Sequence, residues 1–216
     1  MSGFQIFLSE ALLWVEGLAA IVALLFYYKN LVENFWKYFA FFLVFIFLCE
    51  LLGKYGWDRI NFSKAHFYNY LVIPLQFLFF YWLYALKSLK RKALFVVCSS
   101  LYLISFVPSE FYFKGSKIIF SFNYTFGSLI LMVLVVIEYY KQITSADIIN
   151  FNRNRMFYIN LGVTLFYIGT LPFWTFYYFL VSYKQIWSVY FDYFLISGIV
   201  MYILFSISFI WGKQSS

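Results

Sequence analysis

Charged residues are scarce in this chain: only 12% of its 216 residues are Asp, Glu, Lys or Arg, whereas a soluble domain carries about 25%. So few charges exclude a soluble globular domain of this size and also a disordered chain. Histidine occurs once, at His66, and cysteine twice. One histidine excludes a three-histidine metal centre, and two cysteines form no disulfide framework or zinc-site spacing. We therefore expect no metal and no cofactor.

Apolar residues are abundant instead. Hydrophobic residues make up 64% of the chain, aromatic residues 27%, and the mean hydropathy is +0.80. A helix of about 20 predominantly apolar residues crosses the hydrocarbon core of a membrane. Seven stretches of the sequence qualify as such spans. Their approximate ranges are 6–28, 38–52, 67–86, 93–107, 118–140, 156–183 and 186–211.

The apolar stretches are continuous, whereas the strand of a membrane barrel alternates polar and apolar residues over about 10 positions. The sequence therefore predicts an all-α polytopic membrane protein, a bundle of seven transmembrane helices that forms a single domain over residues 1–216. The second stretch is extended at its start by Phe35 and Trp36, and the fourth is the shortest. The first is not expected to be a cleaved signal peptide, because it is long, lacks a preceding basic residue and contains Glu10 and Glu16.

Basic residues set the expected orientation. If seven spans alternate, one side of the membrane holds ten lysines and arginines, and the side with the N-terminus holds six. The densest basic segment, between the third and fourth spans, consists of Lys87, Lys90, Arg91 and Lys92. Because positive residues stay in the cytoplasm, we expect the N-terminus outside and the C-terminus inside. The net charge of +7 is spread over short loops, which favours anionic lipid headgroups of the bilayer over nucleic acid as the partner.

Polar side chains within spans are the candidates for function, because a central charge costs at least about 2.5–3.5 kcal/mol there and is usually paired. Glu16 and Gln76 lie at mid-span, and five more polar residues lie nearer the span ends. These five are Glu10, Glu50, Asn69, Asn123 and Asp192. In the expected orientation all five face the outside. We therefore predict a polar cavity that opens outward and narrows toward Glu16 and Gln76.

Two further features belong to this hypothesis. Lys54, Arg59 and Lys114 are candidate counter-charges for the carboxylates. Pro74 and Pro172 lie inside spans, where each removes one backbone hydrogen bond, so both are candidate hinges of the kind that marks transporter sites. The alternative is structural: the outer acids reach the headgroups, Glu16 is a protonated carboxyl that serves packing, and the prolines have no mechanistic role.

Three segments carry a resemblance. These are Glu16-Gly-Leu-Ala-Ala-Ile21, Glu50-Leu-Leu-Gly-Lys-Tyr55 and Phe67-Tyr-Asn-Tyr followed by Pro-Leu-Gln76. Together they resemble patterns in small, uncharacterised seven-span bacterial membrane proteins, over most of the first three spans. The resemblance implies a multi-pass protein of the bacterial inner membrane and implies no activity.

Two functions fit these features. The first is a channel, transporter or membrane-permeabilising protein that moves ions or a small solute through the cavity, with Glu16 as the coupling group; a chain this small would then act as a homo-oligomer if it forms a pore. The alternative is a sensor or membrane subunit that signals to a cytoplasmic partner docked on residues 87–92. An intramembrane enzyme is disfavoured, because the sequence has no metal cluster, no nucleophile elbow and no catalytic histidine at membrane depth.

Overall fold

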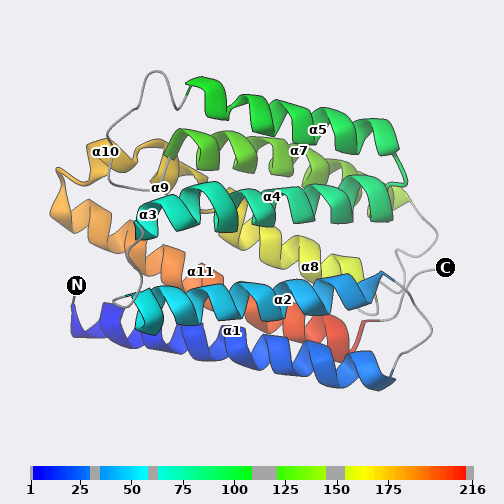
Figure 1. Ribbon diagram of the computed structural model, residues 1–216, viewed down its shortest axis with the longest axis horizontal. Coiled ribbons are helices and arrows are strands. Elements are labelled where there is room, and N and C mark those ends of the chain that lie inside the picture. The colour runs from blue at the N-terminus through cyan, green and yellow to red at the C-terminus, as the bar shows by residue number, and fades with distance from the viewer. Residues whose placement is uncertain (1, 30–34, 58–62, 109–120, 145–153, 213–216) are drawn as a thin grey trace.

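The computed structural model describes residues 2–29, 35–57, 63–108, 121–144 and 154–212, which are helical apart from short turns and contain no β-strand (Figure 1). The α-helical elements are α1 (Gly3–Lys29), α2 (Trp36–Leu51), α3 (Lys64–Phe67), α4 (Ile73–Tyr81), α5 (Lys92–Ile104), α7 (Ser121–Thr144), α8 (Arg155–Val163), α9 (Leu171–Thr175), α10 (Tyr177–Leu180) and α11 (Lys184–Ile210). The prediction of an all-α protein is confirmed for the described residues.

Six helical segments are long and apolar enough to cross a membrane. They are Gly3–Phe26, Trp36–Gly56, Lys64–Ser88, Phe122–Thr144, Arg155–Thr175 and Lys184–Ile210. The shortest have 21 residues, which is about 31 Å of helix at a rise of about 1.5 Å per residue and matches the hydrocarbon thickness. These segments fit a multi-pass integral membrane protein.

Two of the predicted spans differ from the structure. The fourth, 93–107, corresponds to α5, which has 13 residues and belongs to a shorter apolar segment, Lys92–Pro108. The sixth was expected to continue to residue 183, but the helix ends at Thr175, and Phe176 leaves the helical conformation with φ −102° and ψ 18°. The residues that follow are rich in Phe and Tyr, which also occupy membrane–water interfaces, so their composition did not distinguish an interfacial turn from a span.

The helices are apolar outside and carry their polar groups inside. On α1 the exposed face consists of large apolar side chains, namely Phe4, Phe7, Trp14, Leu18, Ile21 and Leu25. Gln5 and Glu16 on the same helix are only 2% and 3% exposed. In a soluble protein the exposed face of a helix is mostly polar and its buried face mostly apolar. Helix α1 has the opposite pattern, so its exposed face is suited to lipid.

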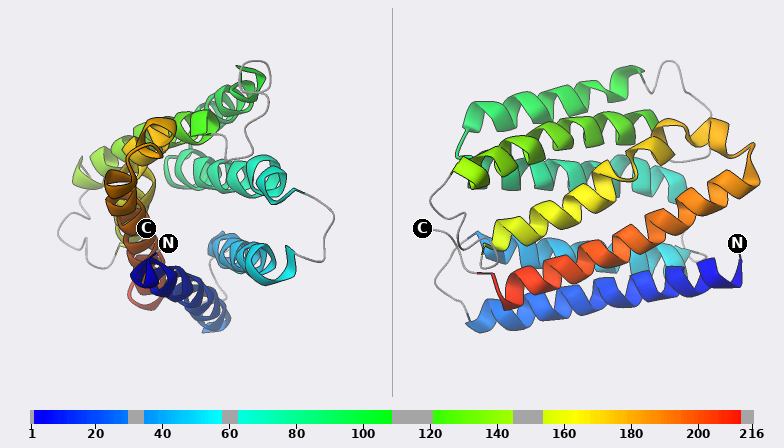
Figure 2. Two further views of the ribbon diagram at one scale, coloured as in Figure 1. Left: turned by 90° about the vertical axis from the view of Figure 1, so that its left-hand side faces the viewer. Right: turned by 180° about the vertical axis from the view of Figure 1, so that it is seen from behind.

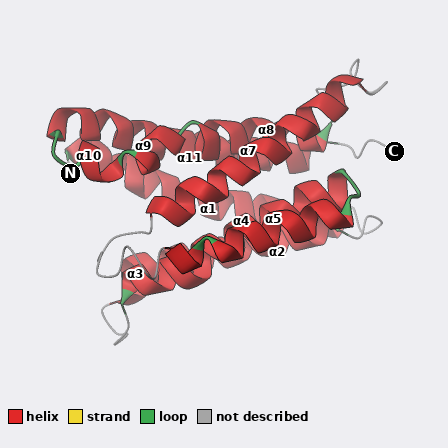
Figure 3. Cartoon of the chain, turned by 90° about the horizontal axis from the view of Figure 1, so that it is seen from above, coloured by secondary structure: helices red, strands yellow, loops and turns green. Residues whose placement is uncertain are grey.

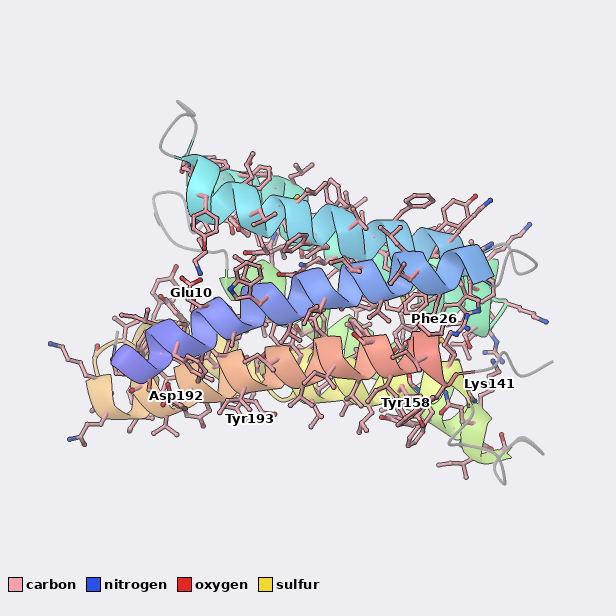
Figure 4. The ribbon with its side chains drawn as sticks, turned by 90° about the horizontal axis from the view of Figure 1, so that it is seen from below. Glu10, Phe26, Lys141, Tyr158, Asp192 and Tyr193 are labelled. Carbon is pink, nitrogen blue, oxygen red and sulfur yellow. The ribbon has the colours of Figure 1, made fainter. Side chains whose placement is uncertain are left out.

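Helix α1 lies at the edge of the bundle and packs between α2 and α11 (Figures 1 and 4). Small buried residues of α1, Ala19, Ala20 and Ala23, allow its backbone to approach its neighbours closely. Seen from above, α2 to α5 lie on one side and α8 to α11 on the other (Figure 3). Helix α5 lies at the edge of the bundle beside α4 and α7, and most of its side chains are exposed (Figure 2).

The in-span prolines follow irregular helix. Tyr68–Val72 is π-helical and ends directly before α4, in which Pro74 is the second residue. Thr164–Ile168 is also π-helical, and a turn at residues 169–170 separates it from α9, in which Pro172 is again the second residue. A proline has no N–H and its ring clashes with the carbonyl four residues earlier, so the wider turns accommodate the two prolines.

Candidate functional site

A cavity of about 420 Å³ lies in the half of the bundle that contains the N-terminus of α1. It is lined by side chains from α1, α2, α4, α7, α9, α10 and α11 and from the π-helical segments beside them. Its lining consists of Ser9, Leu12, Leu13, Glu16, Glu50, Lys54, Tyr68, Val72, Ile73, Gln76, Tyr124, Phe166, Tyr167, Phe173, Trp174, Tyr177, Trp187, Phe191, Phe194, Gly198, Met201 and Tyr202. Half of these residues are aromatic, and most of the others are apolar.

Three of the seven predicted cavity residues line this space, and each accepts a hydrogen bond from a tyrosine. The Tyr202 hydroxyl donates to Glu16 at 2.5 Å, and the Tyr68 hydroxyl donates to Glu50 at 2.9 Å. The Tyr167 hydroxyl donates to the Gln76 side-chain oxygen at 3.3 Å. A polar group that leaves water must regain its hydrogen bonds, and the tyrosines supply one to each of these side chains.

Sequence reasoning missed these tyrosines. Tyr68, Tyr167 and Tyr202 come from three different parts of the chain and stand among 21 tyrosines. Tyr167 and Tyr202 are nearly fully buried, at 2% and 8% exposure. The available signal was that a tyrosine deep in a span needs a partner for its hydroxyl, but that rule does not identify which acid it meets.

Glu10 lies beside the site and not in the cavity lining. Its carboxylate forms a salt bridge with Lys54 at 2.7 Å and accepts a longer hydrogen bond, 3.4 Å, from Tyr55. The side chains of Glu10 and Lys54 are 44% and 27% exposed. Figure 4 shows Glu10 directed from α1 toward the end of the segment that contains α2. Of the expected counter-charges, Lys54 therefore meets an acid, while Arg59 and Lys114 lie outside the described residues.

Asn69, Asn123 and Asp192 do not line the cavity, contrary to expectation. Asn69 and Asn123 are buried within the bundle. Asp192 accepts a hydrogen bond of 2.9 Å from the Gln5 amide, where α11 meets α1 (Figure 4). The rotation of each helix about its axis, which depends on its neighbours and not on the local sequence, directs these side chains away from the cavity.

Beyond Gln76 and Tyr202 the bundle is filled by six phenylalanines, Phe39, Phe42, Phe79, Phe80, Phe205 and Phe209, which we call the phenylalanine cluster. Phe42 and Phe79 stack with ring centroids 3.9 Å apart, and Phe39 contacts Phe205 and Phe209 at 5.2 and 5.5 Å. None of the six lines the cavity. Phe79 and Phe205 follow Gln76 and Tyr202 by about one helical turn, so the cluster closes the end of the cavity that lies away from the start of α1.

Both in-span prolines lie beside the cavity. Val72, Ile73 and Gln76, which flank Pro74, line it, and so do the residues on either side of Pro172, Phe166, Tyr167, Phe173 and Trp174. The two irregular helices therefore contribute wall residues from before and after their prolines. A change in either bend would change the shape of the cavity.

The other half of the bundle also holds a buried acid, at the end of α7. Glu138 is 1% exposed and accepts hydrogen bonds from Ser88 at 2.7 Å and from Gln142 at 3.2 Å. Lys141 lies 3.7 Å from this carboxylate and donates to the backbone oxygen of Ser88 (Figure 4 labels Lys141). Glu138 thus joins the end of α7 to the segment that ends at Ser88.

The basic residues at 87–92 form an ordered turn at that same end of the bundle. Lys87 packs over Trp82 at 5.2 Å, while Lys90, Arg91 and Lys92 are exposed. Lys90 has a positive φ of 57°, and the flanking Leu89 and Arg91 amides donate to the carbonyls of Tyr84 and Ala85. The turn therefore presents its positive charges outward in a fixed arrangement.

Comparison with protein-family models, with curated proteins and with solved structures gave no match. Within the described residues, no three His, Cys, Asp or Glu side chains come together in a way that could hold a metal ion. The site must therefore be interpreted from its own chemistry: two carboxylates and an amide, each bonded to a tyrosine, in an aromatic cavity that is closed at one end.

Proposed function

We propose that this chain is a membrane transporter that takes a small solute into the cavity beside Glu16 and Glu50 and passes it across the bilayer by alternating access. The observation that carries the proposal is the pairing of a carboxylate-containing cavity with a sealed inner end. An open channel would need a continuous polar path, and the phenylalanine cluster interrupts it. A transporter in one of its two states has just such a one-sided cavity.

The two irregular helices support the same function. Transporter sites are commonly formed by discontinuous helices whose bends change between states. Here the helices with Pro74 and Pro172 both contribute wall residues, and both are π-helical directly before the proline. We assign Pro74 and Pro172 the role of hinges about which the cavity walls move.

The proposal includes seven spans with the N-terminus outside, in a bacterial inner membrane. Helix α5 runs between the two ends of the bundle, and the start of α1 and the end of α11 lie at opposite ends (Figure 1), which supports an odd number of spans. In this orientation the cavity opens to the outside, and the exposed Lys90, Arg91 and Lys92 meet the anionic headgroups of the cytoplasmic leaflet. Some of the basic residues that set the orientation, including Arg59, Arg153 and Lys213, lie outside the described residues.

Cysteine labelling tests the topology. In a variant with Cys49 and Cys98 replaced by alanine, Lys92→Cys and Thr144→Cys should both react with an impermeant thiol reagent only after the membrane is permeabilised. Labelling of these two positions from opposite sides would mean that α5 does not span. Ser9→Cys, in the cavity wall, should react from the outside without permeabilisation.

Flux through proteoliposomes tests the transport itself. Vesicles with an imposed proton gradient would be exposed in turn to amines, amino acids, sugars and carboxylates, and uptake would be compared with protein-free vesicles. We expect uptake of one of these classes to fall at least about tenfold in Glu16→Gln, which corresponds to about 1.4 kcal/mol. Asp192→Asn is the matched control, because Asp192 is an acid of α11 outside the cavity lining. Uptake that is absent for every class, or equal in Glu16→Gln and the unaltered protein, would overturn the proposal.

The alternative function, a sensor or membrane subunit, is favoured by one observation, the ordered basic turn at 87–92. Its exposed cations suit an acidic surface of a cytoplasmic partner as well as they suit lipid. Replacement of Lys90, Arg91 and Lys92 by glutamine should then abolish co-purification of a partner while leaving solute uptake unchanged. The proposed transporter requires no such partner.

A further inference from the structure

The chemistry of the cavity also indicates what it binds, and this inference rests on the proposed function. We propose that the ligand is an elongated organic amine, whose ammonium group lies between Glu16 and Glu50 and whose apolar body lies against the aromatic wall. Three sets of observations lead to this assignment: the charges around the cavity, its aromatic lining and its length.

The charge balance favours a cation. Three carboxylates, Glu10, Glu16 and Glu50, lie in or beside the cavity, against two ammonium groups, Lys54 and Lys64. Lys54 is held by Glu10, and Lys64 donates to the Gly53 carbonyl at 2.5 Å. No described cation lies within ion-pair distance of Glu16 or Glu50, whose bound partners are tyrosine hydroxyls. An acid buried in this way is stabilised most by a cation that arrives with the ligand.

The walls fit the rest of such a molecule. Aromatic faces attract cations and also pack against apolar groups, and eleven of the 22 lining residues are aromatic. The Trp187 indole N–H makes no hydrogen bond with a described residue. This donor can bind a polar acceptor at the end of the ligand that is remote from the ammonium group.

The shape of the cavity requires an elongated ligand. Trp187 and Tyr202 both line it and are separated by 15 residues of α11, or about 22 Å along the helix. A volume of about 420 Å³ extended over that distance is a narrow passage. It therefore suits a single chain, or a single ring with a chain, better than a bulky, rounded cation.

Binding of three matched probes to the purified full-length protein tests the ligand class. The probes are 4-phenylbutylamine, 4-phenylbutanol and 4-phenylbutyrate, which share one shape and differ in charge, and binding is followed by calorimetry at neutral pH. We expect the amine to bind at least about tenfold more tightly than the alcohol or the acid, a difference of about 1.4 kcal/mol. Equal affinities, or a preference for 4-phenylbutyrate, would overturn the assignment.

Variants test which residues give the cavity its preference for the amine. The double variant Glu16→Gln, Glu50→Gln should bind the amine and the alcohol with similar affinity, while Asp192→Asn should keep the preference for the amine. Retained binding of 4-phenylbutanol shows that the double variant is folded. If the double variant does not bind 4-phenylbutanol, the single variants Tyr68→Phe and Tyr202→Phe are used in its place. Each should weaken binding of the amine more than binding of the alcohol. An amine preference that survives all of these changes would overturn the assignment.

Two further measurements distinguish the source of the ammonium and separate this inference from the transport proposal. Nanodiscs with phosphatidylethanolamine should weaken amine binding if a lipid headgroup is the natural occupant, and should leave it unchanged if a soluble amine is. Selective amine binding without amine uptake would uphold the ligand class and overturn transport. Uptake of another solute that depends on Glu16, with no preference among the three probes, would uphold transport and overturn the ligand class.

Discussion

The two halves of the bundle differ in how the space between their helices is occupied. The half with the phenylalanine cluster fills its interior with rings, which stack or meet edge to face at centroid distances of 3.9 to 6.3 Å. The half with the N-terminus leaves a cavity of about 420 Å³ and places two carboxylates in it. Close packing stabilises a membrane bundle, so the unfilled half gives up stability that the filled half retains.

The buried acids differ in the same way. Glu138, at the filled end, is surrounded by Ser88, Gln142 and Lys141, and it links two helical segments. Glu16 has one donor among the described residues, Tyr202, and faces the cavity. An acid whose acceptor sites are satisfied by fixed neighbours holds structure together, whereas an acid with unused acceptor capacity next to empty space is available to a ligand.

We expect the largest effect on stability when a ring of the phenylalanine cluster is removed. Phe39→Ala should lower the free energy of unfolding by about 3–5 kcal/mol, the usual cost of removing a buried phenylalanine, because Phe39 is fully buried and contacts four other rings of the cluster. Thermal unfolding of the purified protein measures this. Phe41→Ala is the control, since Phe41 on the same helix is 55% exposed, and a loss of equal size there would contradict the contrast.

A smaller effect is expected in the cavity half. Tyr202→Phe removes the only hydroxyl among the described residues that donates to Glu16, and leaving a buried acceptor without its hydrogen bond costs about 1–3 kcal/mol. Tyr193→Phe, on the same helix, removes a hydroxyl from an exposed side chain bonded to a carbonyl and should cost less. Chemical unfolding in detergent compares the two. If both cost the same, the Tyr202–Glu16 bond has no special role.

The smallest effect on stability, with the clearest effect on function, is expected at a hinge. Pro172→Ala supplies an N–H to a helix that is already bent by a π-helical segment and a turn, so the free energy of unfolding should change by less than about 1 kcal/mol. Solute uptake should fall, because a straighter helix would move Phe173 and Trp174 in the cavity wall. Pro108→Ala, in the shorter segment with α5, should change neither quantity. Normal uptake in Pro172→Ala would exclude a hinge at this position.

Composition predicted most of the fold. Helical spans, their number within one and most of their boundaries follow from the length of the apolar stretches, because every backbone polar group in lipid must be satisfied within its own helix. The end of the sixth span was wrong because the aromatic residues after Thr175 are apolar enough for a span and equally suited to an interface. The fourth predicted span corresponds to α5, which is apolar but short, so the number of seven spans stays a prediction.

For the site, the sequence indicated which polar residues lie within predicted spans, and the structure decided which of their side chains point into the cavity. Glu16, Glu50 and Gln76 were identified because polar side chains are costly within a span, and they do line the cavity. Asn69, Asn123 and Asp192 have the same signal, and their side chains lie elsewhere. Their difference depends on helix rotation and on partners such as Gln5, which is 187 residues away from Asp192.

What the sequence by itself determined, then, is a set of apolar helices that fit a membrane and that contain a few costly polar side chains, because transfer free energies are properties of each residue. Only the tertiary structure decided which of those groups share a cavity, which tyrosines bind them and where the phenylalanine cluster closes the passage. Those outcomes depend on how side chains from distant segments fit together, and that information is not contained in any single stretch of the sequence.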